Sequence, residues 1–328
     1  MNELRQPVAE GVYKALRKLE KTVPPTPLLA AAPGGVLAWL KAESLQPMGA
    51  FKLRGAWHRL TDLSESQARA GVVAFSSGNH AQGVAWAARR LGIRATIVMP
   101  ADSPRRKLAN TVALGAEVVR YDRATESREE IAARIAAETG AVLVPSFDDP
   151  WVIEGQGTAG LEAVAQLAGL GEAAPERVVT CCGGGGLAAG LALALPAAEI
   201  VTVEPEGWDD MARSLAAGTI VPVDADPPPT ACDALQTFRV APRTFDILKA
   251  RGARGLAVSE AETGAAMAWA FTELRLVLEP GGAVALAALL AGKVPPGPRT
   301  LVLLSGGNVD PETFLRMTGF ASARPPYG

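Results

Sequence analysis

Short apolar runs alternate along the chain with longer segments in which apolar residues recur every three or four positions. The run at 71–75 has the length and β-branched content of a buried strand, and the segment at 80–91 places its apolar residues on one helical face. The same alternation predicts further strands at 95–99, 117–121, 141–144, 177–181, 200–203, 255–258 and 299–304. It predicts further helices at 105–114, 128–139, 157–170, 187–195, 259–273 and 282–290. This order indicates an α/β fold of open, mostly parallel sheets with helices on both faces.

The length of 328 residues indicates about two domains, at roughly 150 residues each. The segment Phe147-Asp148-Asp149-Pro150 is turn-like and marks a candidate boundary. We expect residues 71–149 to form a small domain that contacts substrate. Residues 1–70 and 150–328 together would form a larger one.

Composition narrows the classes of function. Net charge is −2 without a block of one sign, so we expect no nucleic-acid partner. The longest apolar stretches, 187–195 and 283–291, are too short to span a membrane, and the charged N-terminus has no secretory pattern. Three cysteines fit neither a disulfide framework nor a zinc site, which favours a reducing, cytoplasmic setting. With only His58 and His80, histidine-rich metal chemistry is excluded.

Four consecutive glycines, Gly183 to Gly186, lie between a predicted buried strand and an apolar helix. Backbone without Cβ atoms can approach an anion closely, and the helix N-terminus adds partial positive charge, so the loop predicts a phosphate site. A flexible turn is the plainer alternative. A dinucleotide is another, because Gly184, Gly186 and Gly190 approximate a Rossmann fingerprint with Glu204 as the ribose carboxylate.

Lys52 follows Phe51 and opens a predicted helix among small and apolar residues. Burial and the positive end of the helix both lower the pKa of an amine, which suits Schiff-base chemistry. The alternative is a surface lysine with a partly buried stem. We expect His58, on the same helix, to lie on the surface.

Four segments together resemble a known family. They are Met48-Gly49-Ala50-Phe51-Lys52, Ser76-Ser77-Gly78-Asn79-His80, the tetraglycine loop and Ser305-Gly306-Gly307-Asn308. In this order they resemble the fold-type-II pyridoxal-phosphate enzymes, in the threonine/serine dehydratase and serine racemase group, over residues 26–308. The resemblance implies two open, mostly parallel twisted sheets of the tryptophan synthase β kind, pyridoxal 5'-phosphate, a small amino-acid substrate and a homodimer. Met48-Gly49-Ala50 departs from the usual Thr/Ser-Gly-Ser.

The resemblance also implies roles in cofactor binding. Lys52 would bond to the cofactor aldehyde and then serve as the catalytic base, with Phe51 beside the ring. Asn79 would donate to the phenolic oxygen, and Ser305 would face the pyridine nitrogen. The phosphate would be held by the glycine loop and the residue after it, namely Gly183, Gly184, Gly185, Gly186 and Leu187.

The turn at 76–80 would bind the substrate carboxylate through Ser76, Ser77, Gly78, Asn79 and His80. A serine there could instead only cap the helix. In racemases of this group the residue that corresponds to Ser77 is the second acid/base. Arg128 aligns with an arginine that some relatives use near the substrate, where it would favour a second carboxylate; an exposed ion pair is the alternative.

Glu204 and Asp210 offer carboxylate oxygens six residues apart, and Trp208 offers a carbonyl between them. Hard oxygen ligands suit Mg²⁺, Ca²⁺ or Mn²⁺. A solvated acidic loop is the plainer alternative, but the resemblance implies a structural metal ion here.

These observations predict a pyridoxal-phosphate-dependent ammonia-lyase that converts L-threonine or L-serine to a 2-oxo acid and ammonia. The alternatives within the family are a serine racemase that uses Lys52 and Ser77, or a 3-hydroxyaspartate ammonia-lyase. The alternative from another class is a dinucleotide-binding oxidoreductase.

Overall fold

The structure is a computed structural model that describes residues 5–32, 37–76, 78–103 and 105–320. Its strands are β1 (Leu28–Ala31), β2 (Ala38–Lys41), β3 (Val72–Phe75), β4 (Ala95–Pro100), β5 (Glu117–Tyr121), β6 (Val142–Leu143), β7 (Arg177–Cys181), β8 (Glu199–Pro205), β9 (Arg254–Val258) and β10 (Thr300–Leu303). Its first helices are α1 (Ala9–Leu19), α2 (Lys52–Leu60), α3 (Glu65–Ala70), α4 (Asn79–Leu91), α5 (Arg105–Ala113), α6 (Arg128–Thr139) and α7 (Pro150–Gly169). The later helices are α8 (Gly186–Ala194), α9 (Asp210–Ala217), α10 (Pro242–Ala250), α11 (Glu260–Trp269), α12 (Pro280–Leu290) and α13 (Pro311–Thr318). Two short 3₁₀ turns, η2 (Glu43–Leu45) and η3 (Asp233–Leu235), and a π-helical turn, η4 (Ala270–Leu274), complete the described elements.

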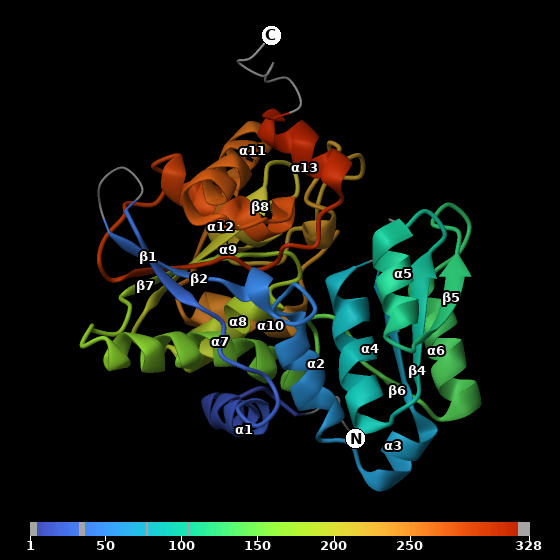
Figure 1. Ribbon diagram of the computed structural model, residues 1–328. Coiled ribbons are helices and arrows are strands. Elements are labelled where there is room, and N and C mark those ends of the chain that lie inside the picture. The colour runs from blue at the N-terminus through green and yellow to red at the C-terminus, as the bar shows by residue number, and fades with distance from the viewer. Residues whose placement is uncertain (1–4, 33–36, 77, 104, 321–328) are drawn as a thin grey trace.

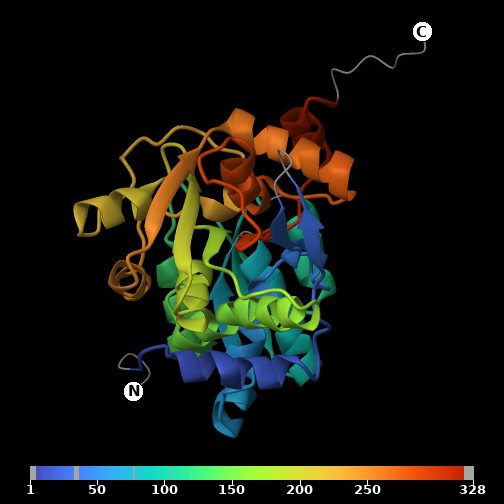
Figure 2. The same cartoon turned by 90° about the vertical axis from the view of Figure 1, so that its left-hand side faces the viewer.

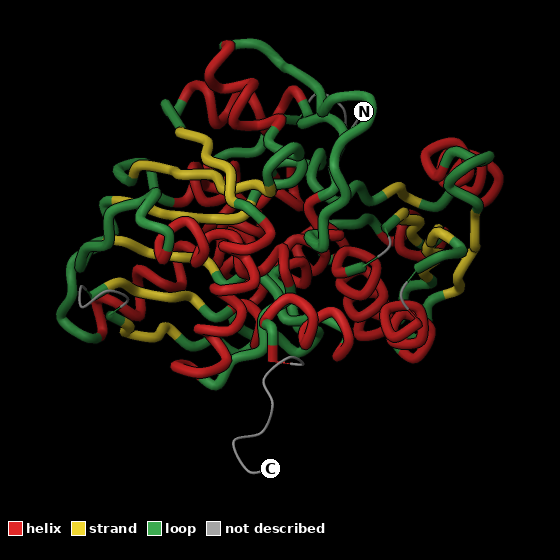
Figure 3. Tube along the Cα trace, turned by 90° about the horizontal axis from the view of Figure 1, so that it is seen from above, coloured by secondary structure: helices red, strands yellow, loops and turns green. Residues whose placement is uncertain are grey.

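The strands form two separate sheets, which lie side by side in Figure 1 and stand apart in the view from above in Figure 3. The large sheet has the order β1-β2-β10-β7-β8-β9, and the small sheet has the order β5-β4-β3-β6. Every pairing is parallel except that of β1 with β2. The expected α/β architecture with mostly parallel sheets is confirmed.

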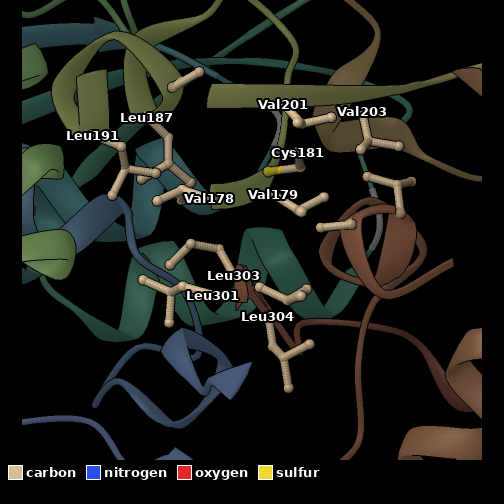
Figure 4. Packing of buried hydrophobic residues seen from close by; sticks show 14 of the residues in the cluster. Val178, Val179, Cys181, Leu187, Leu191, Val201, Val203, Leu301, Leu303 and Leu304 are labelled. Carbon is tan, nitrogen blue, oxygen red and sulfur yellow. The ribbon is translucent and has the colours of Figure 1, made fainter. Parts of the chain in front are cut away.

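Helices cover both faces of the large sheet. In Figure 1, α11 and α12 lie above it and α7, α8 and α1 below it, and Figure 2 shows α7 and α1 running side by side. Strands that are buried on both faces have mostly apolar sequences without alternation. The sequences of β7 and β10 are of this kind, and nearly all of their residues are buried. Figure 4 shows how Val178, Leu187 and Leu301 and their neighbours fill the space between sheet and helices.

The small sheet separates two smaller cores. Val72 and Ala74 of β3 pack toward α4, whereas Val73 between them joins a cluster that includes Ile131 of α6. This alternation follows from the two-residue period of a strand. All four strands of the small sheet lie within 71–149, and the division into domains at these bounds stays a prediction.

The predicted elements exist, with shifted bounds. The helix predicted at 157–170 begins seven residues earlier, at Pro150. Asp149 is its N-cap, and the Asp149 carboxylate accepts a hydrogen bond from the Val152 amide. The helix predicted at 259–273 ends at Trp269 and continues as the π-helical turn η4. The sequence analysis did not predict α1, β1, β2, α3, α9, α10 or α13. None of the described helices is both long and apolar enough to cross a membrane.

Helix α2, which begins at Lys52, is fixed by a buried ion-pair network. Arg54 donates from Nε and Nη2 to both carboxylate oxygens of Glu43, at 2.7 Å each, and its Nη2 lies 2.9 Å from Glu162 Oε1. Lys41 Nζ contacts the same Glu162 oxygen at 2.5 Å. Two cations thus balance two carboxylates, and α2 is tied to both α7 and the large sheet.

Replacing Arg54 with methionine should lower the free energy of unfolding by about 3–5 kcal/mol, because it leaves Glu43 and Glu162 buried without their main cation. Urea denaturation measures this change. The control is Arg69→Met, which breaks a pair with Glu65 whose side chains are 74% and 94% exposed. It should cost less than about 0.5 kcal/mol. Equal effects of the two substitutions would contradict the role assigned to Arg54.

Candidate active site

Two cavities lie at the carboxyl ends of the strands, between residues of both sheets. One, of about 440 Å³, is lined by Ser76, Gly78 and Arg128 among others. The other, of about 70 Å³, lies against the tetraglycine loop and Ser305. Lys52, Asn79, Ser146, Phe147, Ala234 and Thr237 line both. The predicted cofactor and substrate residues that the structure describes therefore converge on one place.

Lys52 sits at the boundary between the two cavities. Its Nζ donates to the backbone carbonyl of Ser146 at 2.8 Å and lies 5.2 Å from the centre of the Phe51 ring. Burial lowers the pKa of this amine from 10.5 to about 8, although Cys181 acts in the opposite direction. The amine has no carboxylate partner among the described residues, so a large part of it is neutral and nucleophilic near pH 8.

The tetraglycine loop has the close packing that excludes side chains. Gly185 has a φ of +88° and is the N-cap of α8. A Cβ on Gly184 would lie 2.2 Å from the Phe147 ring, and Thr244 fixes the loop by donating its hydroxyl to the Gly184 carbonyl at 2.7 Å. The loop and the start of α8 thus line the smaller cavity, and Gly184 and Gly185 have no room for a side chain.

Asn79 and Ser305 flank Lys52 with oriented polar groups. Asn79 Nδ2 donates to Glu279 Oε1 at 2.5 Å, and its Oδ1 accepts from Asn308 Nδ2 at 2.9 Å. Ser305 Oγ accepts from the Cys181 thiol at 3.2 Å, and burial raises the pKa of that thiol, so it stays protonated. The Ser305 hydroxyl proton therefore remains available to a ligand.

The turn after β3 brings its residues to the larger cavity. Ser76 Oγ accepts from the Gly78 backbone N–H at 3.1 Å, and α4 begins at Asn79. His80 also lines the cavity, but its Nε2 pairs with the Val144 carbonyl at 2.8 Å. Burial, and the charge of nearby Lys52, lower the pKa of His80 to about 3, so its ring is neutral. Ser77 lies outside the described residues.

The larger cavity is lined by charged residues of both signs. Arg128 lines it, with its guanidinium 5.3 Å from the Phe75 ring centre and 2.8 Å from Glu129. Lys107 and Arg123 line it as well. Arg128 thus has the exposed ion pair that was considered as the alternative, and it also lines the cavity, whereas its contact with a substrate stays a prediction.

The predicted metal residues are adjacent but engaged with the backbone. The two carboxylate oxygens of Glu204 accept from the amides of Met211 and Ala212, and Asp210 Oδ2 accepts from the amide of Val240. Burial and Asp210 raise the pKa of Glu204, and burial raises that of Asp210 to about 7. Within the described ranges no group of three or more His, Cys, Asp or Glu could hold a metal. Trp208 donates its indole N–H to the Pro228 carbonyl.

His58 is buried, at 2% exposure, and the expectation that it lies on the surface is wrong. Its Nε2 lies 3.3 Å from Glu154 of α7, because the face of α2 that carries His58 packs against α7. The sequence analysis also missed Ser146 and Phe147, which lie in a turn interpreted only as a boundary. It missed Lys107 as well, whose role depends on contacts with residues far away in the sequence.

Replacing Gly185 with alanine should weaken binding of pyridoxal phosphate at least about tenfold, the equivalent of about 1.4 kcal/mol. The new Cβ would lie 2.8 Å from Met211 Cε and 2.9 Å from Thr244 Cβ, so the loop must shift. Fluorescence titration of the apoprotein measures the dissociation constant. The control is Gly292→Ala, whose φ is +71° and which has no atom within 4 Å of its Cβ. If both variants bind as the wild type does, the loop does not hold the phosphate.

Comparison with known proteins gives a consistent result. Residues 19–306 match the family described as pyridoxal-phosphate dependent enzyme. The L-threo-3-hydroxyaspartate ammonia-lyase of Pseudomonas sp is 42% identical over 92% of this chain and 96% of its own length. The serine racemase of Schizosaccharomyces pombe is 38% identical over 94% and 96%. The crystal structure of a threonine deaminase from T.th. superposes with a TM-score of 0.85 at 45% identity, over 93% of this chain and 99% of that one. The chain belongs to the pyridoxal-phosphate-dependent enzymes, within their group of ammonia-lyases and racemases.

Proposed function

We propose that the protein is an ammonia-lyase that converts L-threonine or L-serine to a 2-oxo acid and ammonia, with pyridoxal 5'-phosphate held at Lys52. The observation that carries this proposal is the half-buried Lys52, which lines both the cavity at the glycine loop and the larger cavity. A primary amine with a lowered pKa in this position is suited to bond to an aldehyde.

The residues around the smaller cavity fit the cofactor. The glycine loop from Gly183 to Gly186 and Leu187 at the start of α8 would hold the phosphate by backbone amides. Phe51 would pack beside the ring and Asn79 would donate to the phenolic oxygen. Ser305 would donate its hydroxyl proton to the pyridine nitrogen. When bound, the cofactor supplies an aldehyde for the amine and a conjugated ring that accepts electrons from the substrate.

The remaining residues act on the amino acid. The backbone amides of Ser76, Ser77, Gly78, Asn79 and His80 would bind its carboxylate and so orient its Cα–H bond toward Lys52. The Lys52 amine would take the proton from Cα, and the Cβ hydroxyl would leave with a proton as water, so that an enamine remains. The product hydrolyses to a 2-oxo acid and ammonia.

The cations of the larger cavity favour a second candidate substrate. Arg128 lines this cavity, and its ion pair with Glu129 has side chains that are 38% and 57% exposed, so the guanidinium can exchange that partner for a substrate carboxylate. A substrate with a second carboxylate, such as 3-hydroxyaspartate, would place it there. Racemisation of L-serine is the other alternative within the family, and it requires a second acid/base such as Ser77.

Replacing Lys52 with alanine should abolish the yellow colour of the protein with pyridoxal phosphate and reduce 2-oxo-acid release from L-threonine and L-serine below detection. Absorption spectra and a 2-oxo-acid assay measure these changes. The control is Lys14→Ala on α1, whose side chain is 57% exposed and paired only with Glu10. This control should change neither the yellow colour nor the release of 2-oxo acid. A Lys52→Ala protein that stays yellow and active would overturn the proposal.

Replacing Arg128 with glutamine tests the second candidate. If the second carboxylate binds there, the variant should raise KM for L-threo-3-hydroxyaspartate at least about tenfold, because about 1.4 kcal/mol of charge-assisted bonding is lost. KM for L-threonine, which has no second carboxylate, should change little. Arg134→Gln, at an exposed position of the same helix, is the control. No difference between the two variants would exclude Arg128 as the determinant. Chiral analysis of unreacted L-serine tests for the racemase.

We also propose a divalent metal ion, Mg²⁺, Ca²⁺ or Mn²⁺, bound by the side chains of Glu204 and Asp210 and the carbonyl of Trp208. Both carboxylates are buried, and Asp210 raises the pKa of Glu204, so a cation between them would be favourable. It would brace the neighbouring phosphate loop. The competing explanation for the burial of Glu204 is that its carboxylate accepts from the first backbone amides of α9.

Removal of the metal with a chelator should lower the melting temperature of the holoprotein by at least about 2 °C, and addition of Mg²⁺ should restore it. Asp210→Asn should lose this response. Glu206→Gln, at an exposed position of the same loop, should keep it. An unchanged melting temperature of the wild type with chelator would contradict the metal site.

A further inference from the structure

Asn79 is held in one orientation by groups from the other half of the fold. Its Nδ2 donates to Glu279 Oε1 at 2.5 Å, and its Oδ1 accepts from Asn308 Nδ2 at 2.9 Å. The same Asn308 nitrogen donates to the Met48 carbonyl at 2.8 Å. A carboxylate and a backbone carbonyl can only accept, so both ends of this chain of bonds require the same orientation of the Asn79 amide. One N–H of Asn79 is then left to donate to a ligand in the cavities that it lines.

Glu279 depends on a cation that comes from the small sheet's side. Its Oε2 is buried and makes no hydrogen bond to the described residues, and Lys107 Nζ lies 3.9 Å away. Glu279 is 2% exposed and Lys107 is 7% exposed. An ionised carboxylate at this depth is strongly unfavourable without a cation. The Lys107 ammonium is positioned to supply that charge.

Lys107 reaches from α5 to two elements of the other half. Its second partner is Asp233, with which it forms a close ion pair. Asp233 lies in η3, and Glu279 is the N-cap residue of α12. The charge on Glu279 therefore depends on where α5 lies relative to α12.

The charged groups that face Glu279 act with opposite signs. Burial raises its pKa to about 7, Lys107 opposes this rise, and Asp233 adds to it. The thiols of Cys181 and Cys232 also face Glu279, and burial raises the pKa of both, so they carry no charge near pH 7. Asp310 faces the Lys107 ammonium rather than Glu279.

We propose that Lys107 is a positioning residue that acts through Glu279 on Asn79. Its ammonium favours the ionised form of Glu279, and the ionised carboxylate holds the Asn79 amide so that the free N–H donates to the phenolic oxygen of the cofactor. This inference rests on the proposed binding of pyridoxal phosphate at Lys52. It adds a reason why α5 must be in place before the cofactor is correctly oriented.

The test is the pH dependence of the cofactor's visible absorption in the holoprotein, measured together with the cofactor dissociation constant. In the wild type the transition should lie near pH 7. Lys107→Met should move its midpoint upward by about one pH unit or more, because an opposite charge is lost. Lys107→Arg, which keeps the charge, should restore a midpoint close to that of the wild type.

Asp233→Asn separates a charge effect from a merely structural tie between the two halves. It breaks the ion pair but leaves Lys107 beside Glu279 and removes a repelling carboxylate, so the midpoint should move downward. If Lys107→Met and Asp233→Asn shift the midpoint in the same direction, or neither shifts it, the inference is wrong. A wild type that binds no pyridoxal phosphate would instead refute the proposed function, so the two failures are distinguishable.

Discussion

The proposed chemistry depends on the partial removal of one primary amine from water. Lys52 has no carboxylate partner among the described residues, and its main polar contact is the backbone carbonyl of Ser146. A carbonyl stabilises an ammonium less than a carboxylate does, so desolvation dominates and the neutral amine is accessible near pH 8. A nearby aspartate or glutamate would restore the ordinary lysine pKa. The lack of a carboxylate beside Lys52 among the described residues is therefore consistent with the role proposed for this amine.

The fold supplies rigidity where the amine needs it. Two residues after Lys52, Arg54 binds two carboxylates at full burial, so the first turn of α2 cannot rotate without breaking several charged contacts. Close packing extends this rigidity to the phosphate loop. A Cβ on Gly157 of α7 would lie 2.3 Å from the Gly190 carbonyl of α8. Helices α2, α7 and α8 therefore form one unit that carries both the amine and the glycine loop.

Sequence reasoning succeeded where the chemistry is local. The glycine loop, Lys52 and the turn at 76–80 follow or precede recognisable strands and helices, so their place at the strand ends could be predicted. The burial and partners of residues that pack against distant elements could not be predicted in this way. His58 was expected on the surface because nothing nearby shows that α2 is sandwiched, whereas Glu154 of α7 covers it. Nothing local in the sequence indicates a role for Glu279, because its contact with Lys107 joins residues 172 positions apart.

The small sheet lies between α2 and α7 in the chain, so two connecting segments, rather than one, join it to the rest of the protein. The segment that returns the chain from β6 to α7 contains Ser146, whose carbonyl accepts from Lys52 Nζ. A displacement of this segment would therefore move the main polar partner of the Lys52 amine. The placement of the small sheet and the surroundings of that amine are set by the same few residues.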